Sequence, residues 1–563
     1  MPILDGVPLA PAQAGSINPN LSRDGDTVAP IYPYTESEAP RAEHGLRTYR
    51  PNVGVPAKQI KTGQRLASYF EDFYFRVHIR PDRIALGSLA SEQSRSIEVW
   101  NAWLTANPLH AVNATGAEGM TLLGPAPPPT SFAANEARQY VLAVTPNGPP
   151  TVNATFTFVF GLDSGVLHVT GRRIVGWAFP PNWAHPVIER LEWLTDVLES
   201  HAGFEQRIRL RTAARRGLEY RLLIGKDRDR VKLENLLLAW QARVYGLPIW
   251  TDVSVATAPI PAGSLLLAVD TSHRSFAADG LVGLVLGSES EFAEIDQITP
   301  NSVSLKSPLE RPWPAGTKIL PVQPARVQND LRITHPASAL ADTTVRFEFE
   351  EEWLIPAETG AVTYRGHPVL LAPTNWTEGV DAEHGRKLVA LDYLTGRRAV
   401  DDLSGITTVR RTHRWLLHGR AEISAFRRWL AARAGRLSAF WLPSGQSDLR
   451  LAAAVGASDS ALTVDNRGYA ANVPAAVGRR DIVITTASGQ RFFRRITGAT
   501  ELDADTESLG LDSALGVALP PQQVARIEFL QLVRLDADAV EIAYHTDELA
   551  EVVLGLTSLR DAP

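Results

Sequence analysis

The chain has 563 residues, 44% of them hydrophobic and 21% charged, and at roughly 150 residues per domain it should hold three to five domains. Its 56 basic and 62 acidic residues give a net charge of −6, which argues against a field built over the whole protein to hold nucleic acid. The absence of cysteine excludes disulfides, zinc–thiolate sites, iron–sulfur clusters and cysteine nucleophiles. The 41 Gly and 39 Pro favour many short strands and turns, so we expect a mainly β protein.

The first 60 residues are rich in Pro, Gly, Asn and charge and show little periodicity. We expect an extended arm that either docks onto another body as a tether or forms a disordered leader. The first residues lack a basic segment followed by an apolar one, and no run of about 18 apolar residues occurs. The sequence therefore predicts a soluble chain without an export signal or a membrane-spanning segment.

Residues 61–172 have the texture of a β-sandwich. Alternating apolar runs predict strands at 73–79, 96–100, 139–144 and 154–160, and Gly/Pro-rich loops separate them. Short strands of this kind over about 100 residues are typical of an immunoglobulin-like sandwich. Because the usual Cys pair is absent, the core must be closed by apolar packing alone.

The most informative feature is an internal duplication. Residues 219–250 align without a gap with residues 412–443, at an offset of 193. Identical pairs include Arg221/Arg414, Leu223/Leu416, Leu237/Leu430, Ala239/Ala432 and Arg243/Arg436. Each copy predicts a strand, a helix and a strand. In the first, the apolar residues recur at the spacing of one helix face, and in the second Gly435 is a plausible stop.

A β-rich stretch follows each copy, at about 252–328 and about 447–532. Five or six short strands with Gly and Pro turns predict a small barrel inserted in each repeat. After the barrels, residues 344–349 and 539–544 read as strands that rejoin the parent sheet.

Residues 194–211, 435–448, 479–482 and 496–502 together resemble tail-tip proteins of long-tailed bacterial viruses, in particular Mu-like siphophages. Residues 194–211 resemble a strand pair of distal-tail and baseplate-hub proteins, with the word Gly203-Phe204-Glu205-Gln206-Arg207 after a Thr-Asp-Val strand. Residues 435–448 resemble a second phrase, a Gly-Arg pair followed by an aromatic-Trp-x-Pro strand end, and residues 479–482 and 496–502 have the same texture. The resemblance covers roughly residues 190–560, whereas the first 190 residues carry no comparable motif.

The resemblance implies tail-tube-like β-sandwiches with a flanking helix, assembled around a channel. It gives a first repeat at 173–353, a linker at 354–405 and a second repeat at 406–563. Two units per chain imply a trimeric ring with pseudo-six-fold symmetry, with a hexameric distal-tail ring as the alternative. The expected partners are further copies of the chain and the tail tube, tape measure, hub and fibre proteins. DNA would pass transiently without specific binding, and the protein, made in the host bacterial cytoplasm, would reside in the virion.

No catalytic motif survives inspection: the chain has no GxxxxGK[ST], HExxH or GxSxG, and no GxGxxG at a strand–helix junction. His413 and His418 flank one strand and point to opposite faces, so they cannot readily share a metal. The carboxylates of residues 348–352 and 503–505 are not placed as a glycosidase pair would be. We therefore expect no enzyme activity, cofactor or metal.

An arginine row gives the candidate interface or lumen residues. Arg207, Arg209 and Arg211 alternate with apolar residues, and Arg215 and Arg216 follow. The row either lines a lumen or meets an acidic partner, or it is the solvated side of an amphipathic strand.

The sequence favours a non-enzymatic structural component of a tail tip or baseplate, joining the tail tube to hub or fibre proteins around the DNA exit channel. A receptor- or carbohydrate-binding tail protein is the alternative, and a cell-wall hydrolase is a third class.

Overall fold

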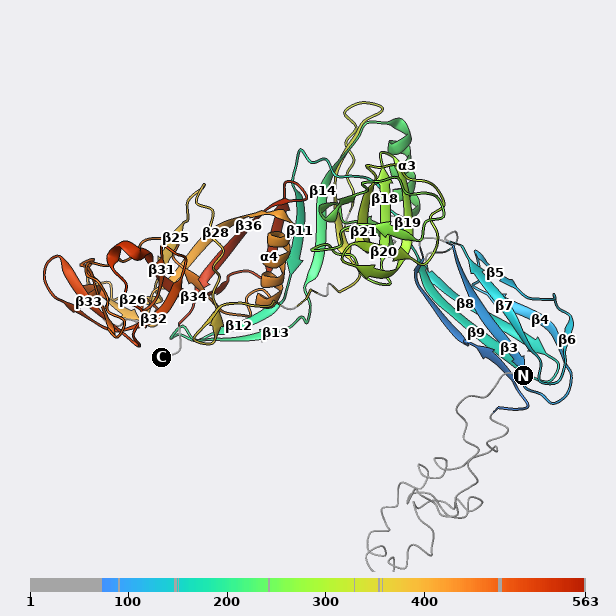
Figure 1. Ribbon diagram of the computed structural model, residues 1–563, viewed down its shortest axis with the longest axis horizontal. Helices are drawn as coiled ribbons and strands as arrows, with labels where there is room; N and C mark the ends of the chain where they lie inside the picture. The colour runs from blue at the N-terminus through green and yellow to red at the C-terminus, as the bar shows by residue number, and fades with distance from the viewer. Residues whose placement is uncertain are drawn as a thin grey trace, which may run out of the picture. The chain divides into compact units, whose positions relative to one another are not determined.

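The computed structural model describes residues 73–89, 92–145, 149, 151–240, 244–328, 330–352, 355–356, 358–473 and 478–560 (Figure 1). The arm predicted over residues 1–60 lies outside these. The described chain is mainly β, as the composition predicts, and it divides into two compact units at Arg173/Ile174. Each unit is described by itself.

The first unit is a sandwich of two sheets around one apolar core. One sheet has the order β1-β3-β7-β5, and the other has the order β2-β9-β8-β4-β6. The strands are β1 (Val77–Arg80), β2 (Arg83–Leu89), β3 (Gln93–Asn101), β4 (Asn107–Thr115), β5 (Met120–Leu123), β6 (Thr130–Phe132), β7 (Ala137–Val144), β8 (Thr151–Phe160) and β9 (Ser164–Arg173). The two sheets pack together because alternate side chains of their strands are apolar. In β8, for example, every second side chain is buried in the core that both sheets share. The strand predicted at 73–79 begins only at Val77, since Phe75 has a φ of 59° and interrupts the extended backbone.

The second unit is organised on one antiparallel sheet. Its strands pair in the order β22-β14-β11-β35-β36-β28-β25. They are β11 (Val187–Glu192), β14 (Arg215–Ile224), β22 (Ala341–Phe349), β25 (Ala382–Gly385), β28 (Thr408–His418), β35 (Ala539–Tyr544) and β36 (Leu549–Ser558). The strands predicted at 344–349 and 539–544 therefore do rejoin the parent sheet. The inward side chains form one core that draws on both parts of the unit.

The two parts of this unit, the first half (174–349) and the second half (367–560), pair their strands in the same way. In the first half β14 pairs with β22 and β15 (Val244–Pro248) with β21 (Lys318–Val327); in the second, β28 pairs with β36 and β29 (Phe440–Pro443) with β34 (Val524–Leu535). Helix α3 (Asp227–Trp240) follows β14 in the chain, and helix α4 (Gly419–Arg433) follows β28. Helix α4 ends as predicted, because Ala434 and Gly435 take left-handed backbones.

The offset of 193 extends upstream of the segment that revealed it. Hairpin strands β12 (Thr195–Glu199) and β13 (Glu205–Arg209) return as β26 (Leu388–Asp392) and β27 (Arg398–Asp402), each 193 residues later (195 to 388, 205 to 398). Downstream of the helix the offset becomes 195. Tyr245 and Phe440 occupy the same place in the sheet, since their partners Ala325 and Val533 pair in turn with the last residues of β22 and β36. The ungapped alignment is therefore two residues out of register in the strand after the helix.

Each half also carries an inserted sheet with its own core. In the first half its strands pair in the order β17-β20-β19-β18-β21, and in the second in the order β30-β33-β32-β31-β34. The additional strands are β17 (Leu266–Ala268), β18 (Leu281–Leu286), β19 (Glu289–Thr299), β20 (Ser302–Leu305), β30 (Ala461–Asp465), β31 (Asp481–Thr486), β32 (Arg491–Glu501) and β33 (Thr506–Leu511). The two small cores are separate from the main one.

Candidate functional site

The outward face of the central sheet is a field of mixed charge. Alternation along each strand buries one set of side chains and turns the other set outward. The charged members of the outward set are Arg190, Glu192, Arg215, Glu219, Arg221, Asp342, Arg346, Glu348, Arg410, Arg414, Glu541 and Glu551. With Glu383 of β25, the face carries six arginines and seven carboxylates, so it has almost no net charge.

Most charged side chains of this face form ion pairs with side chains of neighbouring strands. Nε of Arg346 lies 2.6 Å from Oε2 of Glu219, and Nη1 of Arg414 lies 2.6 Å from Oε1 of Glu551. Arg221 pairs with Asp342, which holds the pKa of that carboxyl below its usual range through hydrogen bonding. Exposed pairs of this kind add little stability, about 0–1 kcal/mol each. Their effect is to leave no row of free positive charge along the sheet.

The five candidate arginines do not form one surface. Arg215 lies on the outward face, with Nε 3.9 Å from Oε1 of Glu348. Arg216, the next residue, points into the core, where Nε donates to Glu189 and Nη1 to Gln323. The neighbours Arg207, Arg209 and Arg211 lie on or just after β13, away from that core: Arg207 is half-buried beside Glu205, Arg209 is exposed, and Arg211 donates to the Glu192 carbonyl.

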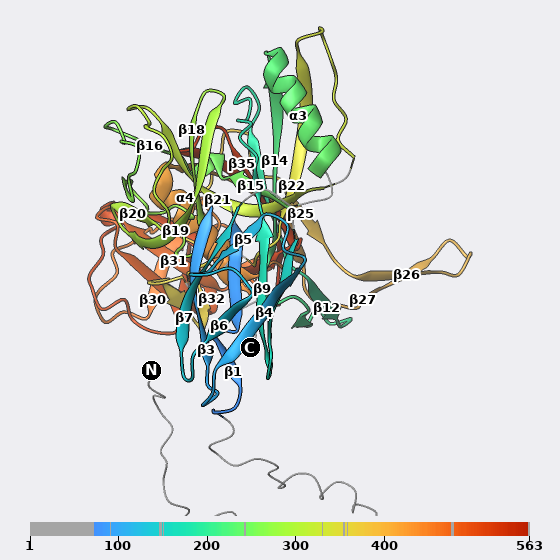
Figure 2. The same cartoon turned by 90° about the vertical axis from the view of Figure 1, so that its right-hand side faces the viewer.

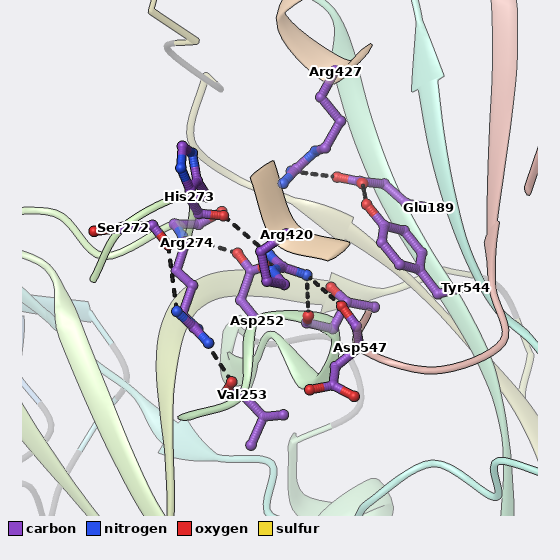
Figure 3. A network of polar contacts seen from close by, with 12 residues as sticks. Glu189, Asp252, Val253, Ser272, His273, Arg274, Arg420, Arg427, Tyr544 and Asp547 are labelled. Carbon is purple, nitrogen blue, oxygen red and sulfur yellow. Dashed lines mark hydrogen bonds and ion pairs between the residues drawn. The ribbon is translucent and has the colours of Figure 1, made fainter. Parts of the chain in front are cut away.

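A buried polar network joins the two halves, and the sequence analysis did not find it (Figure 3). Arg427 of α4 reaches into the first half, where its Nη2 donates to Oε1 of Glu189 across 2.9 Å. The other oxygen of Glu189 accepts from the hydroxyl of Tyr544 at 2.7 Å. Two turns earlier on the same helix, Arg420 pairs with Asp252 and donates to the Thr251 carbonyl. A signal was present, because two arginines seven residues apart on an otherwise buried helix face require buried acceptors.

The network keeps its acids ionised. Burial alone would raise the pKa of Asp252, but the guanidinium groups of Arg420 and Arg427 and a hydrogen bond from Ser275 bring it to about 2. The same balance lowers the pKa of Glu189, where Arg427 and Arg216 outweigh the cost of burial. Burial raises the pKa of Tyr544, so its hydroxyl stays protonated and donates. The junction is therefore held by paired charges rather than by neutral groups.

Two hairpins extend from the sheet and differ in their surroundings. Hairpin β12–β13 of the first half lies against the second half: Arg534 donates to both oxygens of Glu205 at 2.7 Å, and the Arg560 guanidinium lies 4.7 Å from the Phe204 ring. Hairpin β26–β27 projects from the body in Figure 2. All ten of its strand residues are exposed, and Leu394 at its tip is 93% exposed. The second hairpin carries exposed apolar side chains, among them Leu391, Leu394 and Val400, that no other described residues cover, and it also carries the ion pair Arg398–Asp392.

The histidines behave as the strand pattern predicts. His413 is buried in β28 and stacks on Trp415, whereas His418 at the end of the strand is exposed. Burial and the nearby Arg411 lower the pKa of His413 to about 4. Within the described residues, no group of three His, Cys, Asp or Glu side chains lies close enough to hold a metal ion. None of the described helices is long and apolar enough to cross a membrane.

Comparison with known proteins adds no relative: no family model matches the sequence, and no curated protein matches it either.

Proposed function

We propose that this chain is a structural component of a bacteriophage tail tip or baseplate that surrounds the DNA exit channel and joins the tail tube to hub or fibre proteins. In this proposal each half of the second unit is a tail-tube-like sandwich with a flanking helix and an inserted small barrel, and the first unit is an immunoglobulin-like sandwich. The protein acts by assembling rather than by catalysis.

One observation carries the proposal: the two halves join edge to edge into one antiparallel sheet through β11 and β35. A sheet built by head-to-tail addition of matching units has an unsatisfied edge at each end, and closure into a ring is the way to remove both. Three copies would contribute six such units, which gives the trimeric pseudo-six-fold ring; six copies of one chain give the alternative hexamer.

The charge of the sheet suits a channel. Strong binding of DNA requires a row of free Lys and Arg, which release counterions from phosphates. The outward face of the central sheet instead balances its arginines against carboxylates, pair by pair. A wall of this kind would let a polyanion slide past without holding it.

Electron microscopy of the purified full-length chain tests the proposal. We expect closed rings with a central channel, containing six similar units when three chains assemble. Particles that stay monomeric at every concentration, alone and with tail proteins from the same virus, would rule the proposal out.

A further inference from the structure

The first half ends in an edge that resembles β35 but has no partner strand among the described residues. Thr334 forms a bridge with Asp342 next to β22, and Ala543 of β35 pairs with Glu551 of β36 in the same way, 209 residues later (334 to 543, 342 to 551). The segment 331–334 thus occupies the place of β35. Its alternation also matches, with Leu331 and Ile333 packed against the core where β35 has Val540 and Ile542. Strand β11 covers the outer edge of β35, but no described strand covers that of segment 331–334.

The second half offers the complementary edge. Strand β25 lies beside β28 as β11 lies beside β14, in the same register at the offset of 193 (Arg190 opposite Gly217, Glu383 opposite Arg410). Strand β11 carries β35 on its other side. Among the described residues, β25 carries nothing on its other side.

We propose that segment 331–334 of one copy pairs antiparallel with β25 of a second copy, in the register in which β35 pairs with β11 within the chain. The inference deepens the ring proposed above and rests on it, because it names the two edges that close the ring. It commits both edges to one occupant, another copy of this chain. The contact is heterologous, so each copy donates one edge and accepts the other.

Charge on the two edges supports this pairing and opposes the wrong ones. Within the chain Arg190 lies opposite Glu541, with Nη1 3.6 Å from Oε1. The same register between copies places Glu383 opposite Arg332, an ion pair of reversed polarity. Both side chains are exposed and form no ion pair within the described chain. Pairing segment 331–334 with β11 would instead oppose Arg332 and Arg190, and like charges directly opposite destabilise a sheet.

The helices give an independent sign of the same contact. In α4, Arg420 and Arg427 are buried against the first half. The corresponding positions of α3, 193 residues earlier, are Asp227 and Glu234, on a side of the helix where Val231 is 41% and Leu238 is 87% exposed. The two positions that α4 buries as arginines are therefore acids on α3, beside the exposed Val231 and Leu238. Leu233 and Leu237 of α3 are buried as their counterparts in α4 are, and Arg230 of α3 pairs with Glu234 across 2.7 Å.

The second half has an open hollow where the first half receives α4. The hollow has a volume of about 520 Å³, and His384, Arg411 and Arg479 line it. At the offset of 193, His384 and Arg411 correspond to Leu191 and Leu218 of the first half. These two leucines share a core with Ile423 and Phe426 of α4. Nε of Arg411 is buried and has no hydrogen-bond partner among the described residues. Asp448 also lines the hollow beside these basic groups, and Glu234 on α3 of a second copy adds a second carboxylate.

Cysteine cross-linking tests the strand pairing, and the natural chain, having no cysteine, gives no background. Directly opposed residues of an antiparallel pair lie close enough for a disulfide. A mixture of full-length Arg332→Cys and Glu383→Cys chains should form disulfide-linked dimers on mild oxidation, at least tenfold more than either variant alone. The matched control is the double variant Arg190→Cys/Glu541→Cys, which should form its disulfide within one chain and leave the mass unchanged.

Two further substitutions test the contact without cysteines. Arg332→Glu should raise the concentration needed for half-assembly at least tenfold, and the added change Glu383→Arg should restore it. Leu238→Glu should raise that concentration similarly, whereas Leu502→Glu, at an exposed leucine of the inserted sheet, should leave it unchanged.

The outcomes separate this inference from the proposed function. Rings without the 332–383 cross-link, or either variant linking to itself, would overturn the edge pairing and leave the ring standing. Absence of rings and of cross-links, with the intrachain control formed, would overturn both.

Discussion

Arg427 of α4 donates from Nη2 to Oε1 of Glu189 in β11 across 2.9 Å, and the two residues belong to different halves of the second unit. Both side chains are almost fully buried, at 6% and 1% exposure, and Arg216 approaches the same carboxylate at 2.5 Å. One acid thus holds two arginines, one from each half. The junction between the halves is therefore an obligatory part of the fold.

Removing one partner of this network should be costly. We expect Arg427→Met to lower the free energy of unfolding by about 2–3 kcal/mol, because the buried Glu189 then loses the guanidinium of α4 and keeps only Arg216 and the Tyr544 hydroxyl. Urea denaturation followed by circular dichroism measures the change. Arg346→Met, which breaks the more exposed pair with Glu219 on the central sheet, is the control and should cost about 1 kcal/mol or less. Equal effects of the two substitutions would contradict the account of the junction.

Asp252 should make the junction sensitive to acid. Its pKa of about 2 lies below the usual value of an unfolded aspartate, about 3.9, so Asp252 is protonated at a lower pH in the folded state than in the unfolded state. The stabilisation it provides is present above about pH 4 and is lost as the pH falls toward 2. Asp252→Asn should flatten the fall of stability over that window, as measured by urea midpoints at a series of pH values. An unchanged pH profile in the variant would refute the assignment.

His413 should act over a higher window. Burial and Arg411 bring its pKa to about 4, below the usual 6.5, so protonation favours the unfolded chain. The stability that neutral His413 provides is complete above about pH 6.5 and decreases by up to about 3 kcal/mol on the way to pH 4. His413→Gln should remove this slope. The exposed His418 is the matched control, and its replacement by Gln should leave the slope intact.

Substitutions in the two hairpins should affect different properties, assembly in one case and folding stability in the other. Leu391→Ser with Leu394→Ser in β26–β27 should change the free energy of unfolding by less than about 0.5 kcal/mol, because both side chains are exposed, yet it should prevent assembly. Phe204→Ser in the first hairpin should instead lower stability by roughly 1 kcal/mol, since Arg560 packs on that ring. Thermal unfolding and mass photometry read the two effects. The equivalent hairpin β12–β13 lies against the second half, so we expect β26–β27 to lie against the next copy in the ring. A loss of stability without a loss of assembly in the first variant would contradict that contact.

The sequence predicted the parts of the fold that local pattern encodes. The strand–helix–strand units and the returning strands at 344–349 and 539–544 carry apolar periodicity, and the structure contains them. The stretch 187–209 repeats at 380–402 almost without identity; only Val187/Val380, Leu198/Leu391 and Gly203/Gly396 agree. The two stretches form the same strands because backbone pairing holds them, and this pairing does not require identical side chains. The two glycines are the remaining signal, since both have a φ of 79° at the hairpin tip.

The candidate surfaces were harder to predict because they depend on pairing between distant strands. The row from Arg207 to Arg211 reads as one face only if the strand continues, but β13 ends at Arg209. Arg215 and Arg216, adjacent in sequence, fall on opposite faces of β14. The cross-strand ion pairs of the central sheet, such as that of Arg346 with Glu219, and the link from Arg427 to Glu189 join residues more than 120 positions apart, which no local pattern records.

An electron cryomicroscopy map of the assembled full-length chain tests the central claim most directly. The account predicts a closed ring in which one uninterrupted antiparallel sheet runs through every copy, with segment 331–334 of each chain beside β25 of the next and α3 seated in the neighbouring hollow. A two-fold dimer, or a ring whose copies meet through any other edges, would contradict it.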